Sequence, residues 1–124
     1  MRGSELDTPS LLVDLLRLTA NLERMAQYAR AADLKFRPHT KTHKTPEIAK
    51  LQLEHGAVGI TVAKVGEAEV MAEAGISDIF IANEIVGAPK IERLVAVARR
   101  AKVSVGADSM EAYIARADAK ERTG

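Results

Sequence analysis

Short apolar runs recur along this chain and alternate with segments of helical pattern. Residues 57–64, 78–83 and 102–108 form near-continuous apolar runs, as expected for strands that are covered on both faces. Residues 34–39 predict an earlier strand of the same series. Strands that recur about every 20 residues, with a helix between them, indicate a parallel sheet built from βα units.

The segments between these runs carry helix signals. Thr45 and Pro46 suit an N-cap and a first helical position, and Gly56 suits the end of that helix. From Leu15 onwards, apolar residues fall on one stripe of a helix of about five turns. Further helices are predicted at 65–74, at 89–101 and after a possible N-cap at Ser109.

The two ends of the chain differ from its middle. Residues 10–14, SLLVD, form an apolar run of strand length, and residues 118–124, DAKERTG, predict a frayed, charged tail. The sequence has no signal-peptide pattern and no apolar run near the ~18 residues that a membrane span needs. We therefore expect a soluble protein that does not bind a membrane.

The alternation of strands and helices fits two folds, a (β/α)8 TIM barrel and an open doubly wound sheet. No Gly-x-Gly-x-x-Gly or Gly-x-x-x-x-Gly-Lys-Ser/Thr motif follows a predicted strand, so the phosphate-binding loops that are usual in open sheets are missing. The barrel is therefore favoured. The 124 residues suffice for a single domain, residues 1–124, with a core of its own.

Composition excludes several classes of function. The 18 Lys and Arg residues balance 17 Asp and Glu residues, so no global field attracts nucleic acid or an anionic membrane. The chain has no cysteine, which excludes disulfides and thiolate metal sites and fits a reducing cytoplasm.

Positive charge is nevertheless concentrated in residues 35–47, KFRPHTKTHKTPE. If the first part of this stretch is extended, side chains alternate, and one face carries all the basic groups: Lys35, Arg37, His39, Lys41 and His43. Protonated groups about 7 Å apart repel by roughly 2 kcal/mol at an effective dielectric of ~20. Such crowding favours an unprotonated lysine or an anionic partner, and a phosphate-bearing aldehyde cofactor provides for both.

Other interpretations of this stretch stay open. A run of charge is commonly a solvated face. His39 and His43 are four residues apart, as in zinc-binding helices, but the intervening TKT lacks the Glu of His-Glu-x-x-His. Pro38 has no N–H to donate, which suits a strand end.

Four more polar residues lie near predicted element ends. Lys64 and Asn83 end predicted strands, so they are candidates for lining the mouth of the barrel, where ligands bind at the carboxyl ends of the strands. Simple strand termination explains them equally well. Asp108 is more simply an N-cap, and His55 is more simply a cap at a helix C-terminus.

Several stretches together resemble a known family. They are LDTPSLLVDL, RPHTKTHK, GEAE, NEIVG and VSVGADS, and they extend over nearly the whole chain. In combination they are similar to the amino-terminal part of the D-threonine aldolase and D-serine dehydratase family. Members of that family are pyridoxal-phosphate-dependent enzymes with an alanine-racemase-like fold.

The resemblance implies that Lys41 is the lysine that binds the aldehyde of pyridoxal phosphate. We add His39 as a second cofactor-binding candidate because the alternation places it on the same strand face. The resemblance also implies that residues 1–14 belong with a separate β domain. About four βα units would then remain, half of a barrel of the alanine racemase N-terminal type.

The activity that the resemblance implies is that of a lyase acting on β-hydroxy-D-amino acids, with retro-aldol cleavage of D-threonine preferred. D-serine dehydration and amino-acid racemisation are the enzymatic alternatives, and a catalytically incomplete binding or structural piece is the non-enzymatic one. The family uses a divalent metal, Mn or Zn, whose ligands are expected outside this sequence. We therefore predict no metal ligand here.

Half a barrel leaves two sheet edges and half of the interior uncovered. We therefore expect the chain to behave as a fragment that is poorly stable alone, or that pairs with a second copy or with a missing half. Thermal unfolding followed by circular dichroism, with the mass in solution measured in parallel, tests this expectation. A single sharp transition of a dilute monomer would contradict it.

Overall fold

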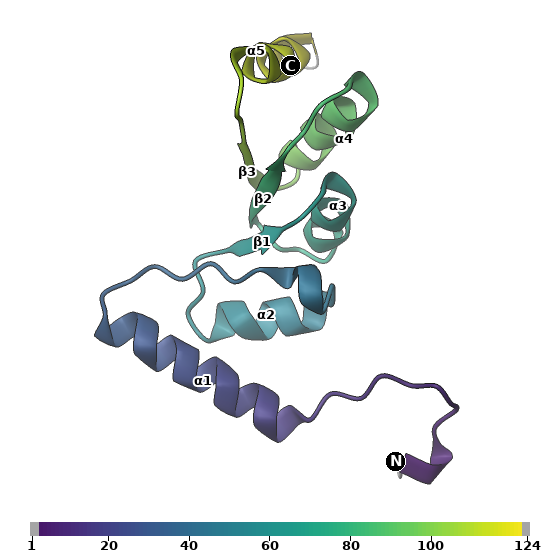
Figure 1. The fold of residues 1–124 in the computed structure, drawn as a ribbon, viewed down its shortest axis with the longest axis vertical. Helices are drawn as coiled ribbons and strands as arrows, with labels where there is room; N and C mark the ends of the chain where they lie inside the picture. The colour runs from purple at the N-terminus through teal and green to yellow at the C-terminus, as the bar shows by residue number, and fades with distance from the viewer. Residues whose placement is uncertain (1–2, 123–124) are drawn as a thin grey trace.

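The computed structural model describes residues 3–122 and contains a three-stranded parallel sheet (Figure 1). Strands β1 (Ile60–Val62), β2 (Asp78–Glu84) and β3 (Lys102–Gly106) lie in sequential order. Helix α3 (Val65–Glu73) connects β1 to β2, and helix α4 (Ala88–Ala98) connects β2 to β3. The predicted βα repeat is confirmed for these units.

The other elements flank this sheet. Before β1 come η1 (Gly3–Glu5), α1 (Leu15–Ala31), η2 (Thr40–Thr42) and α2 (Pro46–Glu54), and after β3 comes α5 (Met110–Arg122). None of the helices within residues 3–122 combines the length and the apolar character needed to span a membrane.

One face of the sheet carries the core. Ile60 pairs with Ile79 and Val62 pairs with Ile81, and all four side chains are completely buried. Figure 1 shows α3 and α4 together on one side of the strands. Their buried residues join the same cluster, which includes Val65, Ala68, Met71, Ile91, Leu94 and Val97. Removal of this apolar surface from water is the main force that holds the helices on the sheet.

The opposite face of the sheet has a different composition. Thr61 pairs with Phe80, and Phe80 pairs with Ser104, so the three form one row across the strands. Phe80 is half-buried and Ser104 is exposed. In a (β/α)8 barrel the face away from the helices lines the interior. This row therefore corresponds to the inner face of a barrel wall.

An ion-pair cluster ties the amino-terminal ends of the strands together. Arg37 Nη1 lies 2.7 Å from Asp78 Oδ1 at the start of β2, and Lys102 Nζ at the start of β3 lies 3.4 Å from Asp78 Oδ2. The hydrogen bond from Arg37 is the main cause that lowers the pKa of Asp78. The sequence predicted that Arg37 and Lys41 share a face. That prediction is wrong, because the Arg37 guanidinium is held at the amino-terminal ends of the strands, whereas Lys41 lies near their carboxyl ends.

Residues 34–39 are less regular than predicted. Phe36 O accepts a hydrogen bond from Val58 N–H at 2.9 Å, and Pro38 O accepts one from Thr61 N–H at 2.7 Å. Only one isolated parallel bridge, between His39 and Thr61, joins this segment to β1. Pro38 donates no backbone hydrogen bond, and the chain then turns into η2. The predicted alternation from Lys35 to His43 is therefore wrong beyond His39.

The predicted strand at residues 10–14 is also absent. Leu11, Leu12 and Val13 are 103%, 73% and 55% exposed, and no strand within residues 3–122 pairs with them. An isolated strand leaves its N–H and C=O groups without ladder partners, so an apolar run alone does not produce one. Asp14 instead caps α1 by accepting a hydrogen bond from Arg17 N–H at 3.1 Å.

The boundaries of the later helices agree better with the prediction. Pro46 begins α2, and Gly56 follows it with a φ of +97°, a conformation that a glycine adopts without strain. The predicted fraying of residues 118–124 is wrong for the described part, because α5 continues to Arg122. Ala, Lys, Glu and Arg are good helix formers, so the charge of this segment does not end the helix. Residues 123–124 lie outside the described chain.

The tight packing around Arg37 generates a stability prediction. A Cβ at Gly59 would lie 2.7 Å from Asp78 O and would overlap the Arg37 guanidinium. We expect Gly59→Ala to lower the free energy of unfolding by about 1–3 kcal/mol, because the backbone or Arg37 must move. Chemical denaturation measures this change.

Gly106→Ala is the matched control within a strand. The nearest atom to its added Cβ would be Asn83 O at 3.5 Å, an ordinary contact. We expect this variant to unfold within about 1 kcal/mol of the wild type. Equal losses of stability in the two variants would contradict the proposed packing of Arg37.

Candidate functional site

Lys41 lies on η2, the turn that follows the extended segment at the carboxyl edge of the sheet. Its neighbour Thr40 is 1% exposed and donates from Oγ1 to Thr61 O at 3.1 Å. Lys44 N–H donates to Thr40 O at 2.8 Å and closes the turn. The Lys41 side chain itself is exposed. Ligands of parallel barrels bind at this carboxyl edge, so the structure places Lys41 at the expected end of the sheet, although on a turn and not on a strand.

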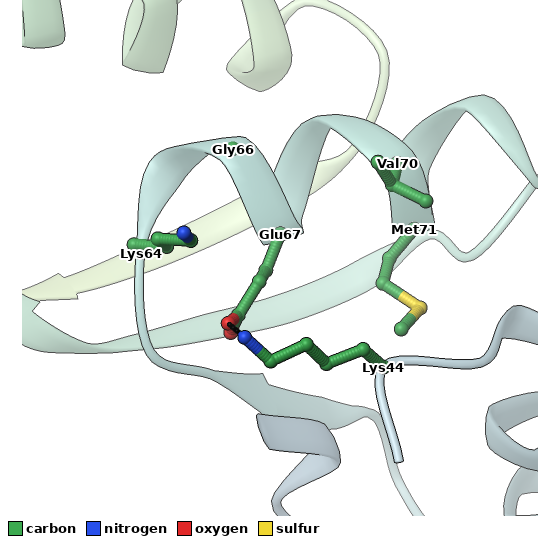
Figure 2. Close-up of a pocket in the computed structure, with 6 residues that line it drawn as sticks. All are labelled: Lys44, Lys64, Gly66, Glu67, Val70 and Met71. Atoms are coloured by element: carbon green, nitrogen blue, oxygen red, sulfur yellow. Dashed lines mark ion pairs between the residues drawn. The ribbon is translucent and has the colours of Figure 1, made fainter. Parts of the chain in front are cut away.

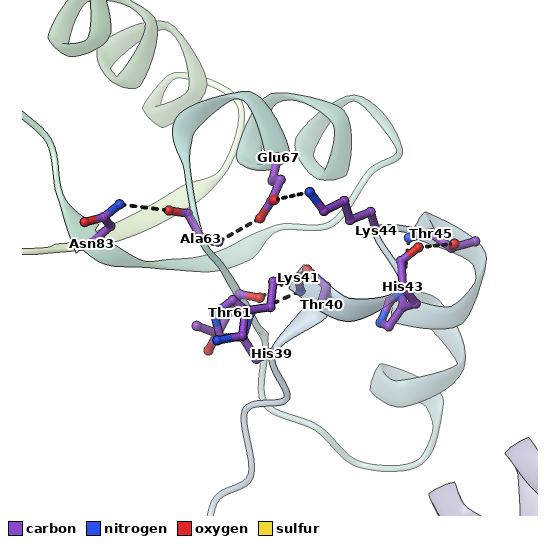
Figure 3. A network of polar contacts seen from close by, with 10 residues as sticks. All are labelled: His39, Thr40, Lys41, His43, Lys44, Thr45, Thr61, Ala63, Glu67 and Asn83. Carbon is purple, nitrogen blue, oxygen red and sulfur yellow. Dashed lines mark hydrogen bonds and ion pairs between the residues drawn. The ribbon is translucent and has the colours of Figure 1, made fainter.

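His39 lies directly before this turn and is half-buried. Its Nδ1 accepts a hydrogen bond from Lys41 N–H at 3.2 Å (Figure 3). The proton of the neutral ring is therefore on Nε2. His39 thus helps to fix the backbone of Lys41 and retains one ring donor. The two predicted site residues are brought together, as the sequence suggested, but through the backbone of the turn.

His43 is directed to a different environment. Its Nδ1 accepts a hydrogen bond from Thr45 N–H at 3.0 Å, next to the start of α2. Burial lowers the pKa of His43, and the Gln52 side chain opposes this effect only in part. The zinc site considered for His39 and His43 lacks a third ligand, because no group of three His, Cys, Asp or Glu residues suited to a metal occurs within residues 3–122.

Glu67, in the first turn of α3, links the strand end to the turn that carries Lys41. Its Oε2 accepts a hydrogen bond from Ala63 N–H at 2.7 Å, and its Oε1 lies 3.2 Å from Lys44 Nζ (Figure 3). The Glu67 side chain is only 8% exposed, whereas that of Lys44 is 57% exposed. Burial acts to raise the pKa of Glu67, but the Ala63 N–H and Lys44 outweigh it and hold the pKa below 4.5. The carboxylate is therefore charged at neutral pH.

A shallow pocket of about 270 Å³ opens beside this ion pair (Figure 2). It is lined by Lys44, Lys64, Gly66, Glu67, Val70 and Met71. Lys64 is the N-cap residue of α3, but its side chain makes no capping hydrogen bond. Figure 2 shows the Lys44 side chain extended across the pocket to Glu67.

The remaining polar candidates have mainly structural contacts. Asn83 Nδ2 donates to Ala63 O at 3.2 Å and so joins the carboxyl ends of β2 and β1. His55 is the C-cap of α2, as predicted, and its Nδ1 lies 2.7 Å from Leu51 O. Asp108 is exposed in the segment before α5.

The expected crowding of positive charge is not what the fold produces. Asp78 neutralises Arg37 at one edge of the sheet, and Glu67 neutralises Lys44 at the other. Arg37, which was predicted to share a face with Lys41, is therefore held away from it, whereas Lys44 was not part of that predicted face. The electrostatic argument from alternation is wrong, because it assumed an extended chain where the structure has a turn.

Sequence reasoning missed the role of Glu67. The available signal was a Glu at the third position of a helix that directly follows a strand, where a carboxylate accepts orphan backbone N–H groups. Its second partner, Lys44, lies 23 residues earlier in the chain, since 67 − 44 = 23. No local pattern predicts that pairing.

The fold and the site define a class of protein: a segment of a parallel α/β barrel with an exposed lysine at the carboxyl edge of its sheet. The chain belongs to the family described as "Alanine racemase, N-terminal domain", whose model matches residues 13–124. The predicted alanine-racemase-like family is thereby confirmed.

Individual proteins are similar over most of this chain. A D-threonine aldolase of Arthrobacter sp is 49% identical over 86% of the chain, which spans 28% of that protein. The crystal structure of D-threonine aldolase from Filomicrobium marinum matches with a TM-score of 0.95 and 41% identity, covering 98% of this chain and 33% of that one. D-threo-3-hydroxyaspartate dehydratase from Delftia sp. HT23 matches with a TM-score of 0.84 and 35% identity, covering 97% and 32% respectively. The chain thus spans about a third or less of these proteins.

The buried carboxylate of Glu67 generates a prediction on pH. Its pKa is lower in the folded state than the usual 4.5, so it stabilises the fold fully above that value and loses the contribution as the pH falls through the folded pKa. Glu67→Gln should lower the free energy of unfolding by on the order of 1–2 kcal/mol at pH 7. The difference from the wild type should shrink below about pH 4.5.

Urea unfolding of both proteins between neutral and acidic pH measures this difference. Asp78 and Glu69 also have lowered pKa values, so the wild type loses stability in acid for several reasons. Only the difference between the two proteins isolates Glu67. A difference that is constant across the whole pH range would contradict the assignment.

Proposed function

We propose that this chain provides the cofactor lysine of a pyridoxal-phosphate-dependent lyase that acts on β-hydroxy-D-amino acids. The leading reaction is the retro-aldol cleavage of D-threonine. The proposal depends on one combined observation: an exposed Lys41 at the carboxyl edge of a sheet, in a chain 49% identical to a D-threonine aldolase. Lys41 is the proposed catalytic residue, and His39 is a second proposed cofactor contact.

The residues around Lys41 fit an aldehyde cofactor. The primary amine is exposed, while hydrogen bonds from Lys41 N–H to His39 and from Thr40 to Thr61 hold the backbone of the turn. The Nε2–H of a neutral His39 is a donor of the kind that phosphate or ring oxygen atoms accept. Figure 1 shows α3 and α4 on the other side of the strands, so these helices do not cover the inner face, which carries the exposed Ser104 and the half-buried Phe80.

The chemistry of Lys41 follows from its amine. Lys41 would hold pyridoxal phosphate covalently, because a primary amine condenses with an aldehyde and releases water. When bound, pyridoxal phosphate supplies a conjugated ring that accepts electrons released by bond cleavage at Cα. For D-threonine, loss of the hydroxyl proton and cleavage of the Cα–Cβ bond would release acetaldehyde, and addition of a proton to Cα would give glycine.

Dehydration is the second candidate reaction, because the chain matches D-threo-3-hydroxyaspartate dehydratase with a TM-score of 0.84. D-serine dehydration and amino-acid racemisation need the same lysine and belong to the same proposal. A divalent metal, Mn or Zn, would assist loss of the β-hydroxyl proton or of the hydroxyl. Within residues 3–122 no group of three His, Cys, Asp or Glu side chains is suited to a metal. We propose that the metal ligands lie outside this part of the chain.

The proposed activity also implies a partner. Leu11, Leu12 and Val13 are exposed, and the inner face of the sheet is uncovered by helices. Burial of such surfaces favours association with a second copy or with a chain that completes the barrel. The same proposal includes this partner and a small-molecule D-amino acid substrate. It also includes a soluble protein located in the cytoplasm.

Lys41→Arg tests the cofactor site, because arginine keeps the charge but does not condense with an aldehyde. We expect wild-type protein incubated with pyridoxal phosphate, then reduced with borohydride and digested, to carry the pyridoxyl group mainly on Lys41. The variant should lose this modification, and Lys35→Arg should retain it. Mass spectrometry of the peptides measures the modified fraction. An unmodified Lys41 in the wild type would refute the proposed cofactor site.

Substrate assays separate the reactions. We expect D-threonine with added Mn²⁺ to yield acetaldehyde, while D-threo-3-hydroxyaspartate and D-serine test for ammonia release. Lys41→Arg should abolish any turnover. Retained cofactor on Lys41 without any turnover would favour the alternative of a catalytically incomplete binding piece.

A further inference from the structure

The η2 turn is attached to the rest of the molecule at both ends. At its start, Thr40 Oγ1 donates to Thr61 O at 3.1 Å, within β1. Beyond its end, Lys44 Nζ lies 3.2 Å from Glu67 Oε1. Lys41 lies between the two attachments, and its own side chain has no burial to hold it. The position of its amine therefore depends on how firmly the turn is held.

We propose that Glu67 is a positioning residue for Lys41, because it fastens the carboxyl end of the turn to the carboxyl end of β1. The inference rests on the proposed function of Lys41. Glu67 uses one carboxylate oxygen for Ala63 N–H, directly after β1, and the other for Lys44 (Figure 3). One buried side chain thus spans the strand end and the turn.

The burial of Glu67 makes the loss of either of its partners costly. The Glu67 side chain is 8% exposed, so its charge is largely shielded from water and depends on its two partners. Lys44 is 57% exposed, so the buried member of this pair is the carboxylate. A pair in which both side chains are more exposed is worth less, because water competes for both charges. Glu69, two residues later, provides such a surface comparison, since it pairs with the exposed Arg93.

The backbone of Lys44 gives independent support. Its φ is +52°, in the left-handed region that non-glycine residues seldom occupy. Such a conformation persists when surrounding contacts favour it. Two contacts do so here, the hydrogen bond from Lys44 N–H to Thr40 O and the ion pair of Lys44 with Glu67. Loss of the ion pair frees the turn to adopt other conformations.

The consequence for Lys41 is chemical. A misplacement of about 1 Å at a reacting group costs on the order of 100-fold in rate. On a loosened turn, Lys41 would keep its amine, but its rate of reaction with the aldehyde would fall toward that of other exposed lysines. Selectivity for Lys41, measured against Lys50 on α2 in the same molecule, therefore reports positioning.

The experiment measures the ratio of pyridoxyl modification at Lys41 to that at Lys50 under limiting pyridoxal phosphate. The modification is trapped with borohydride and measured by peptide mass spectrometry. Circular dichroism checks that each protein is folded under the conditions used. We expect Glu67→Gln and Lys44→Met to lower the wild-type ratio about 10-fold. Lys44→Arg, which keeps the ion pair, should restore most of it, and Glu69→Gln should leave it unchanged.

Asp78→Asn separates positioning from a general loss of stability. It breaks the ion pairs with Arg37 and Lys102 at the opposite edge of the sheet, so it loosens the fold without touching η2. We expect its ratio to stay near that of the wild type. An unchanged ratio in Glu67→Gln, or an equal fall in Asp78→Asn, would overturn the positioning role while Lys41 remains the modified residue. A wild-type ratio near one would refute the cofactor site itself, and the inference with it.

Discussion

One-sided burial of the parallel sheet is the constraint on which the rest of the structure depends. Ile60, Val62, Ile79 and Ile81 are completely buried under the helices, and their removal from water aligns the strands and sets their register. Because side chains alternate along a strand, this burial leaves the intervening residues on the other face. Thr61 therefore faces away from the helices, and the segment that carries His39 joins the sheet beside it.

Two buried or partly buried carboxylates then fasten the opposite edges of the sheet. Asp78 holds Arg37 and Lys102 where the strands begin, and Glu67 holds Lys44 where β1 ends. The two clusters divide the positive charge that the sequence concentrates in one stretch. Lys41 is left at the carboxyl edge with an exposed side chain, which is the arrangement that a lysine needs to meet a dissolved aldehyde. Arg37 and Lys44 thus make structural ion pairs, while Lys41 is the cation of this motif for which we propose a chemical role.

Much of the fold was predictable from local pattern. The apolar runs and the Thr-Pro and Gly signals located β1 to β3 and α2 to α4 because hydrophobic periodicity and capping depend on neighbouring residues. The failures also have physical causes. Residues 40–42 turn where alternation predicted an extended chain. Residues 10–14, whose expected partner is a separate β domain, pair with no strand within residues 3–122. Strand formation requires distant hydrogen-bond partners, which local composition does not report.

The sequence by itself determined the βα order, the apolar face of each strand and the placement of Lys41 and His39 near a strand end, since all three follow from the order of neighbouring residues. The tertiary structure alone decided which cations of residues 35–47 form ion pairs with distant carboxylates. Arg37 meets Asp78, 41 residues away, and Lys44, which lies between η2 and α2, meets Glu67 on α3. Such pairings arise only after the sheet has brought remote segments together, because an ion pair depends on distance in space and not on separation along the chain.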